Sequence, residues 1–432
     1  MEKLKDLISS KKAKVGIIGM GYVGLPLAVE FAKNGMQCMG FEIDKVRVKK
    51  LNKGISYIDD ISSKEIKPLV KSKKLKASSE FGGLKLCDVL IICVPTPLRK
   101  TKDPDVTYII DAARKISQNL RKNQLIVLES TTYPGTTKEL IQPIFESGRL
   151  KCGRDFCLAF SPERVDPGNQ KYNISNTPKV VGGITKTCTA LAKLLYGNIV
   201  DEVIAVSSTQ AAELVKLVEN TFRAVNIALV NEMALMCDKL KINVWEVLSA
   251  AKSKPFGYMP FYPGPGIGGH CIPLDPHYLG WKMRSLDFDP RFIELADEIN
   301  SYMPQYVVYK LAEILNRHKK ALSETKLLVL GVAYKPDISD ERESPAVDVI
   351  TLLQNTGAKV DYFDPHVKKL ELEDRFLTSK KLTARRLKKY DCVVIITAHS
   401  SVDYKWLVEN SKLVFDTRNA TRKIKSKKIY KL

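Results

Sequence analysis

The first half of the chain alternates short apolar runs with amphipathic segments. Apolar runs typical of buried strands occur at Val15–Ile18, Gln37–Phe41, Val89–Val94, Leu125–Leu128 and Phe156–Phe160. Segments with helical periodicity lie between them at Leu25–Asn34 and Tyr108–Asn119. This alternation of strands and helices predicts a parallel, doubly wound sheet.

A second pattern begins near Ser207. The segment from Thr209 to Lys239 contains no Gly or Pro, and its apolar residues recur at three- and four-residue steps. That periodicity predicts one long helix. Its second half is apolar on most faces, which is expected of a helix buried between domains or subunits. A helix buried in the core of one domain would show the same pattern.

A third pattern begins at Lys326. Buried strands are again predicted, at Leu327–Leu330, Val360–Phe363, Val393–Ile396 and Leu413–Phe415, with a helix at Ala346–Asn355. The predicted fold is therefore of the α/β class, with two Rossmann-like doubly wound domains joined by a long central helix. The predicted domain boundaries are 1–206, 207–320 and 321–432.

Composition favours an ordinary globular protein. The 432 residues are 44% hydrophobic and 27% charged, and no apolar run approaches the roughly 18 residues that a membrane helix needs. The first residues lack the pattern of a secretory signal. Nine cysteines without a repeated pair spacing are typical of reduced thiols. We therefore expect a cytoplasmic protein with no membrane partner.

The net charge of +21 has two interpretations. A basic chain can bind nucleic acid, or it can carry solvated lysines on every face. The second interpretation is favoured because the lysines are spread along the chain and no basic motif is interleaved with aromatic residues. We therefore expect no nucleic-acid partner, although a positive field would attract dianionic nucleotides.

A glycine-rich turn follows the first predicted strand. Gly19, Gly21 and Gly24 form a G-x-G-x-x-G pattern between a strand and a helix, which is the context of a dinucleotide site. Glu42 ends the second strand, 18 residues after Gly24. An acid there would bind the adenosine ribose and repel a 2′-phosphate, which predicts NAD rather than NADP. The alternatives are a turn without a ligand, and a 2′-phosphate contact from Arg47.

The segment Pro263–Pro276 holds the strongest candidate for chemistry. Glycines surround Cys271 and would let a substrate approach a thiolate nucleophile. A lone cysteine is more often a small core residue, but His270 and Asp275 nearby favour catalysis. His270, His277 and Cys271 match no usual zinc spacing, so no metal is predicted.

These segments together resemble the UDP-glucose/GDP-mannose dehydrogenase family. The resemblance extends from Val15 to about Arg418 and rests on seven motifs: GIIGMGYVGLPLA, VPTP, ESTTYPGTT, SPER, ELVKLVENTFRAVNIALVNE, GGHCIPLDP and GVAYKPDISDERESP. It implies that 1–206 binds NAD, that 207–320 is a central dimerisation domain with the Cys271 loop, and that 321–432 binds the UDP-sugar.

The resemblance implies a reaction in which an alcohol becomes a carboxylate through two hydride transfers to NAD. Cys271 would add to the aldehyde, and the thiohemiacetal would be oxidised to a thioester. Lys216 and Asn220, four residues apart on a helix, would stabilise the developing alkoxide and oxyanion. Covalent capture would keep the aldehyde from escaping.

Further roles are implied for residues outside these two segments. Asp275 would assist proton transfer through water, Glu163 would activate the hydrolytic water, and Thr131 would orient a water near the cofactor. Cofactor contacts are implied for the glycine-rich turn, including Tyr22 and Val23, and for Glu42, Arg47, Thr96, Ser130, Thr131 and Arg342. For Arg47 and Ser130, a surface charge and a turn hydroxyl are the favoured interpretations. Substrate contacts are implied for Glu163, Arg164, Lys216, Asn220, Lys254, Tyr262, Gly268, Lys335 and Arg418.

Several positions depart from the UDP-glucose branch of the family. Leu274 replaces the lysine that usually precedes the aspartate of the cysteine loop, and Lys254 is the nearest cation where that branch has an arginine. Pro167 replaces a second acid, which would leave water handling to Asp166. The runs GGHCIPLDPHYLGWKMR, SPERVDPG and RFIELADEIN most resemble the branch acting on UDP-N-acetylglucosamine at C6.

The expected function is thus NAD-dependent oxidation of UDP-N-acetyl-D-glucosamine to its uronic acid, for surface polysaccharide precursors, by a homodimer. UDP-N-acetyl-D-mannosamine and UDP-N-acetylgalactosamine remain alternative substrates, since an epimer is invisible to motifs. Two other classes are a silent sugar-nucleotide binding protein and a basic nucleic-acid binder with a borrowed fold. The intact set of Cys271, Lys216, Asn220 and Glu163 argues against the silent protein.

Overall fold

The computed structural model describes residues 1–432 except 59–60, 100, 167, 170 and 374. Pro167, one of the departures noted above, therefore lies outside the described residues. The chain divides into two units, Met1–Glu219 with His277–Phe288, and Asn220–Pro276 with Asp289–Leu432. The three predicted domain boundaries stay a prediction.

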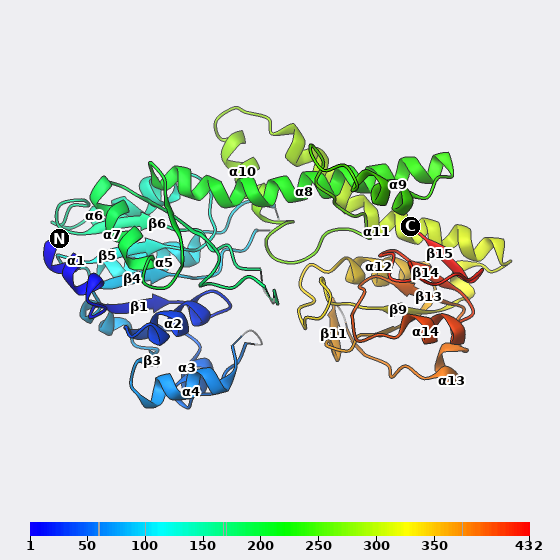
Figure 1. The fold of residues 1–432 in the computed structure, drawn as a ribbon, viewed down its shortest axis with the longest axis horizontal. Coiled ribbons are helices and arrows are strands. Elements are labelled where there is room, and N and C mark those ends of the chain that lie inside the picture. Colours follow the sequence, from blue (N-terminus) through cyan, green and yellow to red (C-terminus); the bar gives the residue numbers. More distant parts are fainter. Residues whose placement is uncertain (59–60, 100, 167, 170, 374) are drawn as a thin grey trace. The chain divides into compact units, whose positions relative to one another are not determined.

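The first unit is built on one sheet of eight strands in the order β3-β2-β1-β4-β5-β6-β7-β8 (Figure 1). The strands are β1 (Lys14–Ile18), β2 (Gln37–Phe41), β3 (Leu75–Ser78), β4 (Val89–Ile92), β5 (Leu125–Leu128), β6 (Cys157–Phe160), β7 (Lys179–Gly183) and β8 (Val203–Ala205). The predicted strands are confirmed, although β4 ends at Ile92 rather than at Val94.

The helices of this unit lie between the strands in the chain. They are α1 (Glu2–Ser9), α2 (Gly24–Lys33), α3 (Lys45–Asn52), α4 (Ser63–Lys71), α5 (Thr107–Ser117), α6 (Gln142–Glu146) and α7 (Lys186–Tyr196), with short turns η1 (Phe81–Leu86) and η2 (Thr136–Ile141). Successive residues of β1 enter different cores: Ile17 packs in the cluster that contains Leu25 of α2, and Ile18 in the cluster that contains Ile109 of α5. Burial on both faces confirms the doubly wound sheet.

One pair of neighbouring strands breaks the parallel order. β7 runs antiparallel to β6, with Phe160 opposite Gly182. The first residues of β7 therefore lie beside the segment that follows the end of β6. The Ser161 hydroxyl donates to the Val180 carbonyl at 2.8 Å, which ties the two segments together. The sequence analysis had no strand at β7.

The long helix α8 (Thr209–Leu240) begins in the first unit. Its buried Glu213 accepts hydrogen bonds from the N–H of Gly135 at 2.6 Å, the N–H of Thr137 at 2.8 Å and the Thr137 hydroxyl at 2.6 Å. These donors lie at the start of η2, where helical N–H groups lack partners within the helix. Glu213 thus fixes the start of α8 on the sheet domain.

The second half of α8 carries an exposed apolar stripe. Its members are Phe222, Leu229, Met233, Met236 and Leu240, and Leu240 has 67% of its surface exposed. The sequence predicted that this half of the helix is buried between domains or subunits. The single chain does not supply this burial, because the residues that pack against α8 cover only part of its circumference.

The second unit contains the remaining helices and a smaller sheet of five parallel strands in the order β10-β9-β13-β14-β15 (Figure 1). Its strands are β9 (Lys326–Leu330), β10 (Lys359–Phe363), β13 (Cys392–Ile395), β14 (Val414–Asp416) and β15 (Ile429–Lys431), and β11 (Lys369–Leu372) pairs with β12 (Arg375–Thr378) as a hairpin. The helices are α9 (Val244–Ala251), α11 (Arg291–Arg317), α12 (Pro345–Asn355), α13 (Ala384–Leu387) and α14 (Tyr404–Asn410), with the turn η3 (Leu322–Glu324). α10 (Asp275–Arg284) belongs to both units.

This second sheet also buries both faces. Val329 and Val394 pack in one cluster, while Leu328 and Val393 pack in the other. The two Rossmann-like domains predicted from the sequence are therefore confirmed. Among the described residues, no helix is long and apolar enough to cross a membrane.

Candidate active site

The glycine-rich turn has the geometry of a dinucleotide cradle. Gly19 has a φ of +88°, and a side chain there would also meet the Cys93 carbonyl. A side chain at Gly24 would collide with the Gly19 carbonyl, whereas the space beside Gly21 is open. Such a turn, followed at once by helix α2, suits a pyrophosphate approaching the backbone. The turn therefore fits NAD, while the contacts predicted for Tyr22 and Val23 stay predictions.

Glu42 connects the end of β2 to this turn. Its carboxylate accepts the Met20 N–H and the Asp44 N–H, both at 3.1 Å. A carboxylate has about four acceptor positions, so it retains capacity for ribose hydroxyls. The Arg47 guanidinium lies 3.8 Å from the Glu42 carboxylate. This pairing orients Arg47 toward Glu42, and both interpretations of Arg47 stay predictions.

Two further predicted cofactor residues follow β4 and β5. Ser130 is buried, and its hydroxyl donates to the Val94 carbonyl at 2.8 Å. Its position fits the turn hydroxyl that the sequence favoured. The Thr96 carbonyl accepts a hydrogen bond from the hydroxyl of Tyr278 in α10. These contacts fix the loops at the carboxyl ends of the two strands.

Three of the predicted catalytic residues lie in the first unit. The Lys216 ammonium donates to the Thr131 hydroxyl at 2.6 Å. Glu163 follows β6, and its Oε1 accepts the N–H groups of Arg164 at 2.9 Å and Val165 at 2.8 Å. Burial acts to raise the pKa of Glu163, but the Lys179 ammonium outweighs it and the pKa is lowered. Lys216 adds a smaller contribution in the same direction as Lys179. The structure therefore brings Lys216, Thr131 and Glu163 into one electrostatic environment.

Arg164 has a structural contact that the sequence did not suggest. Its guanidinium pairs with Glu219 of α8 at 2.6 Å and donates to the Pro178 carbonyl at 2.6 Å. Both contacts hold the segment after β6 in place. A substrate contact from Arg164 stays a prediction.

The remaining catalytic residues lie in the second unit. Asn220 and Asp275 are both buried, and the Asn220 amide donates to the Asp275 carboxylate at 2.6 Å. The Asp275 N–H donates to the Cys271 carbonyl at 2.8 Å. Among the nine cysteines, all of them described and none in a disulfide, Cys271 is exposed and most others are buried. An exposed thiol beside a buried amide–carboxylate pair suits a nucleophile.

The glycines before Cys271 pack closely against the last domain. Gly269 has a φ of +87° and lies against the Tyr334 ring, and Gly268 lies against the Glu343 carbonyl. The Gly269 N–H donates to the Arg342 carbonyl at 3.2 Å. Burial, followed by the Arg342 guanidinium, lowers the pKa of His270. The lowered pKa favours the neutral imidazole of His270 at physiological pH.

Other predicted substrate and cofactor contacts are spread over the second unit. The Arg418 guanidinium donates to the Ile396 carbonyl at 2.9 Å and lies against Gly264. Arg342 pairs with Asp340 at 2.8 Å. The Tyr262 ring stacks on Trp245, with centroids 6.4 Å apart, and the Lys254 ammonium lies 5.1 Å from the Phe256 ring centroid. Lys335, in the same motif as Tyr334, is half-buried.

A His–Asp cluster that the sequence analysis missed lies beneath the Lys335 segment. Ligand-type atoms of Asp337, His366 and His399 lie within 4.8 Å of one another. His399 is buried, and its Nδ1 accepts the Asp337 N–H at 3.0 Å while Nε2 bonds Asp364 at 2.9 Å. Both ring nitrogens are thus used within the protein. The cluster supports the loop and does not present His399 to a metal.

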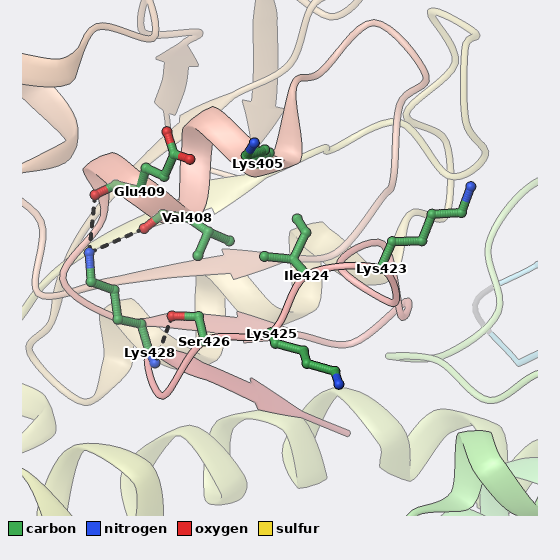
Figure 2. Close-up of a pocket in the computed structure, with 8 residues that line it drawn as sticks. All are labelled: Lys405, Val408, Glu409, Lys423, Ile424, Lys425, Ser426 and Lys428. Atoms are coloured by element: carbon green, nitrogen blue, oxygen red, sulfur yellow. Dashed lines mark hydrogen bonds between the residues drawn. The ribbon is translucent and has the colours of Figure 1, made fainter.

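A surface hollow of about 570 Å³ lies elsewhere on the last domain (Figure 2). It is lined by Lys405, Val408, Glu409, Lys423, Ile424, Lys425, Ser426 and Lys428. Lys428 donates to the Glu409 carbonyl at 3.0 Å, at the end of α14, where helical carbonyls lack partners within the helix. None of the predicted site residues lines this hollow.

The chain matches one family over most of its length. Residues 13–200, 210–302 and 328–423 match, respectively, the NAD binding, central and UDP binding domains of the UDP-glucose/GDP-mannose dehydrogenase family. The chain belongs to the UDP-glucose/GDP-mannose dehydrogenase family. Its cofactor is NAD, and its activity class is that of an NAD-dependent nucleotide-sugar dehydrogenase.

Individual relatives within the family carry different names. The chain is 35% identical over 392 residues to a UDP-N-acetyl-D-glucosamine 6-dehydrogenase of Pseudomonas aeruginosa, covering 90% of this chain and 91% of that protein. It is 34% identical over 419 residues to a UDP-N-acetyl-D-mannosamine dehydrogenase of Methanococcus maripaludis, covering 94% and 92%. The solved structure of a UDP-D-ManNAc dehydrogenase from Pyrococcus horikoshii aligns with a TM-score of 0.87 at 33% identity, covering 97% and 98%.

Sequence reasoning overlooked a set of buried charges behind Glu163. Lys179, the first residue of β7, pairs with Glu163 at 2.9 Å and with Glu129 at 3.1 Å, and Tyr196 donates to Glu129. Glu129 stands in the ESTTYPGTT motif, but the motif gives no sign of its partner. The one sequence signal for a buried cation is the lysine at the start of the apolar run PKVVGG.

Cofactor selectivity tests the role of Glu42. The wild-type protein should show kcat/KM for NAD⁺ at least about tenfold above that for NADP⁺, because the Glu42 carboxylate binds ribose hydroxyls and repels a 2′-phosphate. Glu42→Gln keeps an acceptor oxygen and removes the charge, so it should lower this ratio. Glu80→Gln, at an exposed position, is the matched control. Equal efficiencies in the wild type would show that Glu42 does not select the cofactor.

Proposed function

We propose that the protein oxidises the C6 alcohol of UDP-N-acetyl-D-glucosamine to the carboxylate, with two NAD⁺ and one water consumed per sugar. The uronic acid product would serve as a precursor for surface polysaccharide. The observation that carries the proposal is Cys271, an exposed thiol on a glycine loop beside the buried Asn220–Asp275 pair.

The first half of the reaction removes a hydride and a proton from the alcohol. NAD⁺, held by the glycine-rich turn and Glu42, would supply the hydride acceptor for both oxidations. Lys216, which donates to the Thr131 hydroxyl, supplies a positive charge for the developing alkoxide. Thr131 holds the Lys216 ammonium and orients a nearby water, which carries the proton away.

The second half passes through a covalent intermediate on Cys271. The thiolate adds to the aldehyde carbon, and the resulting alkoxide is stabilised by hydrogen-bond donors that include Asn220. Loss of hydride from this thiohemiacetal leaves a thioester. Asp275, hydrogen-bonded to Asn220, orients that amide and moves a proton through water.

Hydrolysis completes the sequence. Water adds to the thioester carbon, the carbon–sulfur bond breaks, and the carboxylate and the Cys271 thiol are released. Glu163 accepts a hydrogen bond from the attacking water. In the UDP-binding domain, Lys335 and Arg418 bind the nucleotide, and Arg418 is held by the Ile396 carbonyl. Substrate contacts are also proposed for Arg164, Lys254, Tyr262 and Gly268, and a cofactor contact for Arg342.

The choice of sugar rests on the cysteine loop. Leu274 replaces a lysine of the UDP-glucose branch, and an apolar side chain suits a bulkier N-acetyl group. The relatives named above act, by their names, on N-acetylglucosamine and on N-acetylmannosamine. UDP-N-acetyl-D-mannosamine and UDP-N-acetylgalactosamine are therefore the alternative substrates.

A panel of UDP-sugars tests the assignment. With NAD⁺, kcat/KM for NADH formation should be highest with UDP-N-acetylglucosamine, ahead of its mannosamine and galactosamine counterparts and of UDP-glucose. Each sugar should release about two NADH, because two hydrides leave C6. A higher value for another amino sugar would replace the assignment. Absence of NADH with every sugar would favour a silent binding protein.

Replacement of the nucleophile separates covalent capture from binding. Cys271→Ser should abolish acid formation and leave nucleotide binding largely intact, because a serine hydroxyl is far less nucleophilic than a thiolate. Intact-protein mass spectrometry with substrate and NAD⁺ should detect any oxygen-linked adduct that persists. Cys152→Ser, at a half-buried thiol, should cost stability at most. Wild-type rates in Cys271→Ser would reduce Cys271 to a packing residue.

The exposed stripe on α8 favours a dimer. A contiguous apolar surface of this kind usually forms an interface, and a two-fold pair is the commonest symmetry. Sedimentation at micromolar concentration should show a dimer or larger. Leu229→Glu with Met233→Glu should produce monomers, whereas Phe376→Glu, at an exposed position on β12, should not. A clean wild-type monomer would exclude the dimer.

A further inference from the structure

One buried ammonium is shared by two carboxylates in the first unit. The Lys179 Nζ lies 2.9 Å from Glu163 Oε2 and 3.1 Å from Glu129 Oε2. The side chains of Lys179, Glu129 and Glu163 are exposed by only 5%, 0% and 11%. Tyr196, the last residue of α7, donates its hydroxyl to the other oxygen of Glu129. The cluster therefore contains two carboxyl groups, one ammonium group and one uncharged hydroxyl that donates a hydrogen bond.

The topology of the sheet assembles this cluster. Glu129 follows β5, Glu163 follows β6, and Lys179 opens β7. Because β7 is antiparallel to β6, its first residue lies at the edge where parallel strands have their carboxyl ends. A parallel β7 would have placed Lys179 at the opposite edge. The antiparallel pairing of β7 with β6 is thus what brings a cation to two strand ends that carry acids.

The two acids are held differently. Both oxygens of Glu163 have donors: Lys179 on Oε2, and the N–H groups of Arg164 and Val165 on Oε1. Burial acts to raise the pKa of Glu163, but the Lys179 ammonium and these donors outweigh it and hold the pKa below its usual range. Burial raises the pKa of Glu129 in spite of Lys179. The negative charge is therefore most secure on Glu163.

Other titratable groups face the cluster from neighbouring elements. Burial and then Glu129 raise the pKa of Tyr196 and of Cys93, which keeps both neutral. Lys216 of α8 adds to the positive potential at Glu163. The Arg164 guanidinium is paired with Glu219. Lys179 is thus the ionic partner in direct contact with Glu163, and Glu129 is the acid that competes for it.

We propose that Lys179 is a positioning residue that keeps Glu163 ionised and oriented for thioester hydrolysis, and that Glu129 and Tyr196 anchor Lys179 for this task. The inference rests on the hydrolytic role given to Glu163 in the proposed function. A carboxylate that stays ionised accepts a hydrogen bond from water throughout the working pH range. Without Lys179, two adjacent buried acids would retain a proton between them.

Opposite charge changes should shift the pH profile in opposite directions. kcat falls at acid pH as Glu163 gains a proton. Lys179→Met removes the cation and raises the pKa of Glu163. The acid limb of the profile, where kcat falls, should therefore move to higher pH by about one to three units. Glu129→Gln removes the competing acid and should move the limb downward. Lys179→Arg, which restores the charge, should return the profile toward the wild type.

Mass spectrometry identifies the affected step. At pH values below the shifted acid limb, the Lys179→Met variant should accumulate the acyl adduct on Cys271, because hydrolysis is the step that needs ionised Glu163. Lys193→Met and Glu202→Gln, at exposed positions of the same unit, are the charge controls and should leave the profile unchanged. If Lys179→Met folds poorly, Lys179→Met with Glu129→Gln leaves no second acid beside Glu163, and its acid limb should lie above that of Glu129→Gln alone.

A titration without turnover separates the two proposals. In protein labelled with ¹³C at glutamate carboxyls, the Glu163 resonance, assigned with Glu163→Gln, should titrate below the usual value near 4.3 and rise in Lys179→Met. If the wild-type protein formed no NADH, the proposed function would be refuted, but the ionisation of Glu163 by Lys179 would still stand. An unshifted Glu163 titration and unshifted pH profiles in folded variants would overturn the role of Lys179.

Discussion

The carboxyl edge of the larger sheet is the constraint on which the first unit depends. Its inner strands are buried on both faces, so they cannot hold polar side chains along their length without large desolvation costs. Polar groups therefore begin where strands end: Glu42 after β2, Thr96 after β4, Thr131 after β5 and Glu163 after β6. Because these strands are parallel, the groups lie along one edge.

The antiparallel β7 supplies what parallel strands cannot. It places Lys179 at the same edge as Glu129 and Glu163, and the lysine offsets part of the negative charge that strand ends collect. Buried ions persist only when they are paired and hydrogen-bonded. Tyr196 and the N–H groups of Arg164 and Val165 supply the remaining bonds. A site built from acids alone would protonate; this one retains an ionised carboxylate.

The sequence predicted most of the fold because its signals are local. Apolar runs identified the inner strands of both sheets except β7, and the absence of Gly and Pro identified α8. The glycine turn was found because Gly19 and Gly24 meet steric conditions that any side chain would violate. The edge strands β3, β8 and β15 were missed, since short, partly exposed strands lack a continuous apolar run.

The sequence by itself thus determined the class of fold, the NAD cradle and the candidate nucleophile Cys271, all of which depend on residues close together in the chain. Tertiary structure decided which distant side chains meet. Lys179 reaches Glu129 across 50 residues, Glu213 caps η2 across 76 residues, and Asn220 reaches Asp275 across 55 residues. It also decided that an apolar stripe on the second half of α8 is exposed in the single chain. Periodicity records which face of a helix is apolar, but only packing determines what covers that face, and only strand direction determines which charges share a buried site.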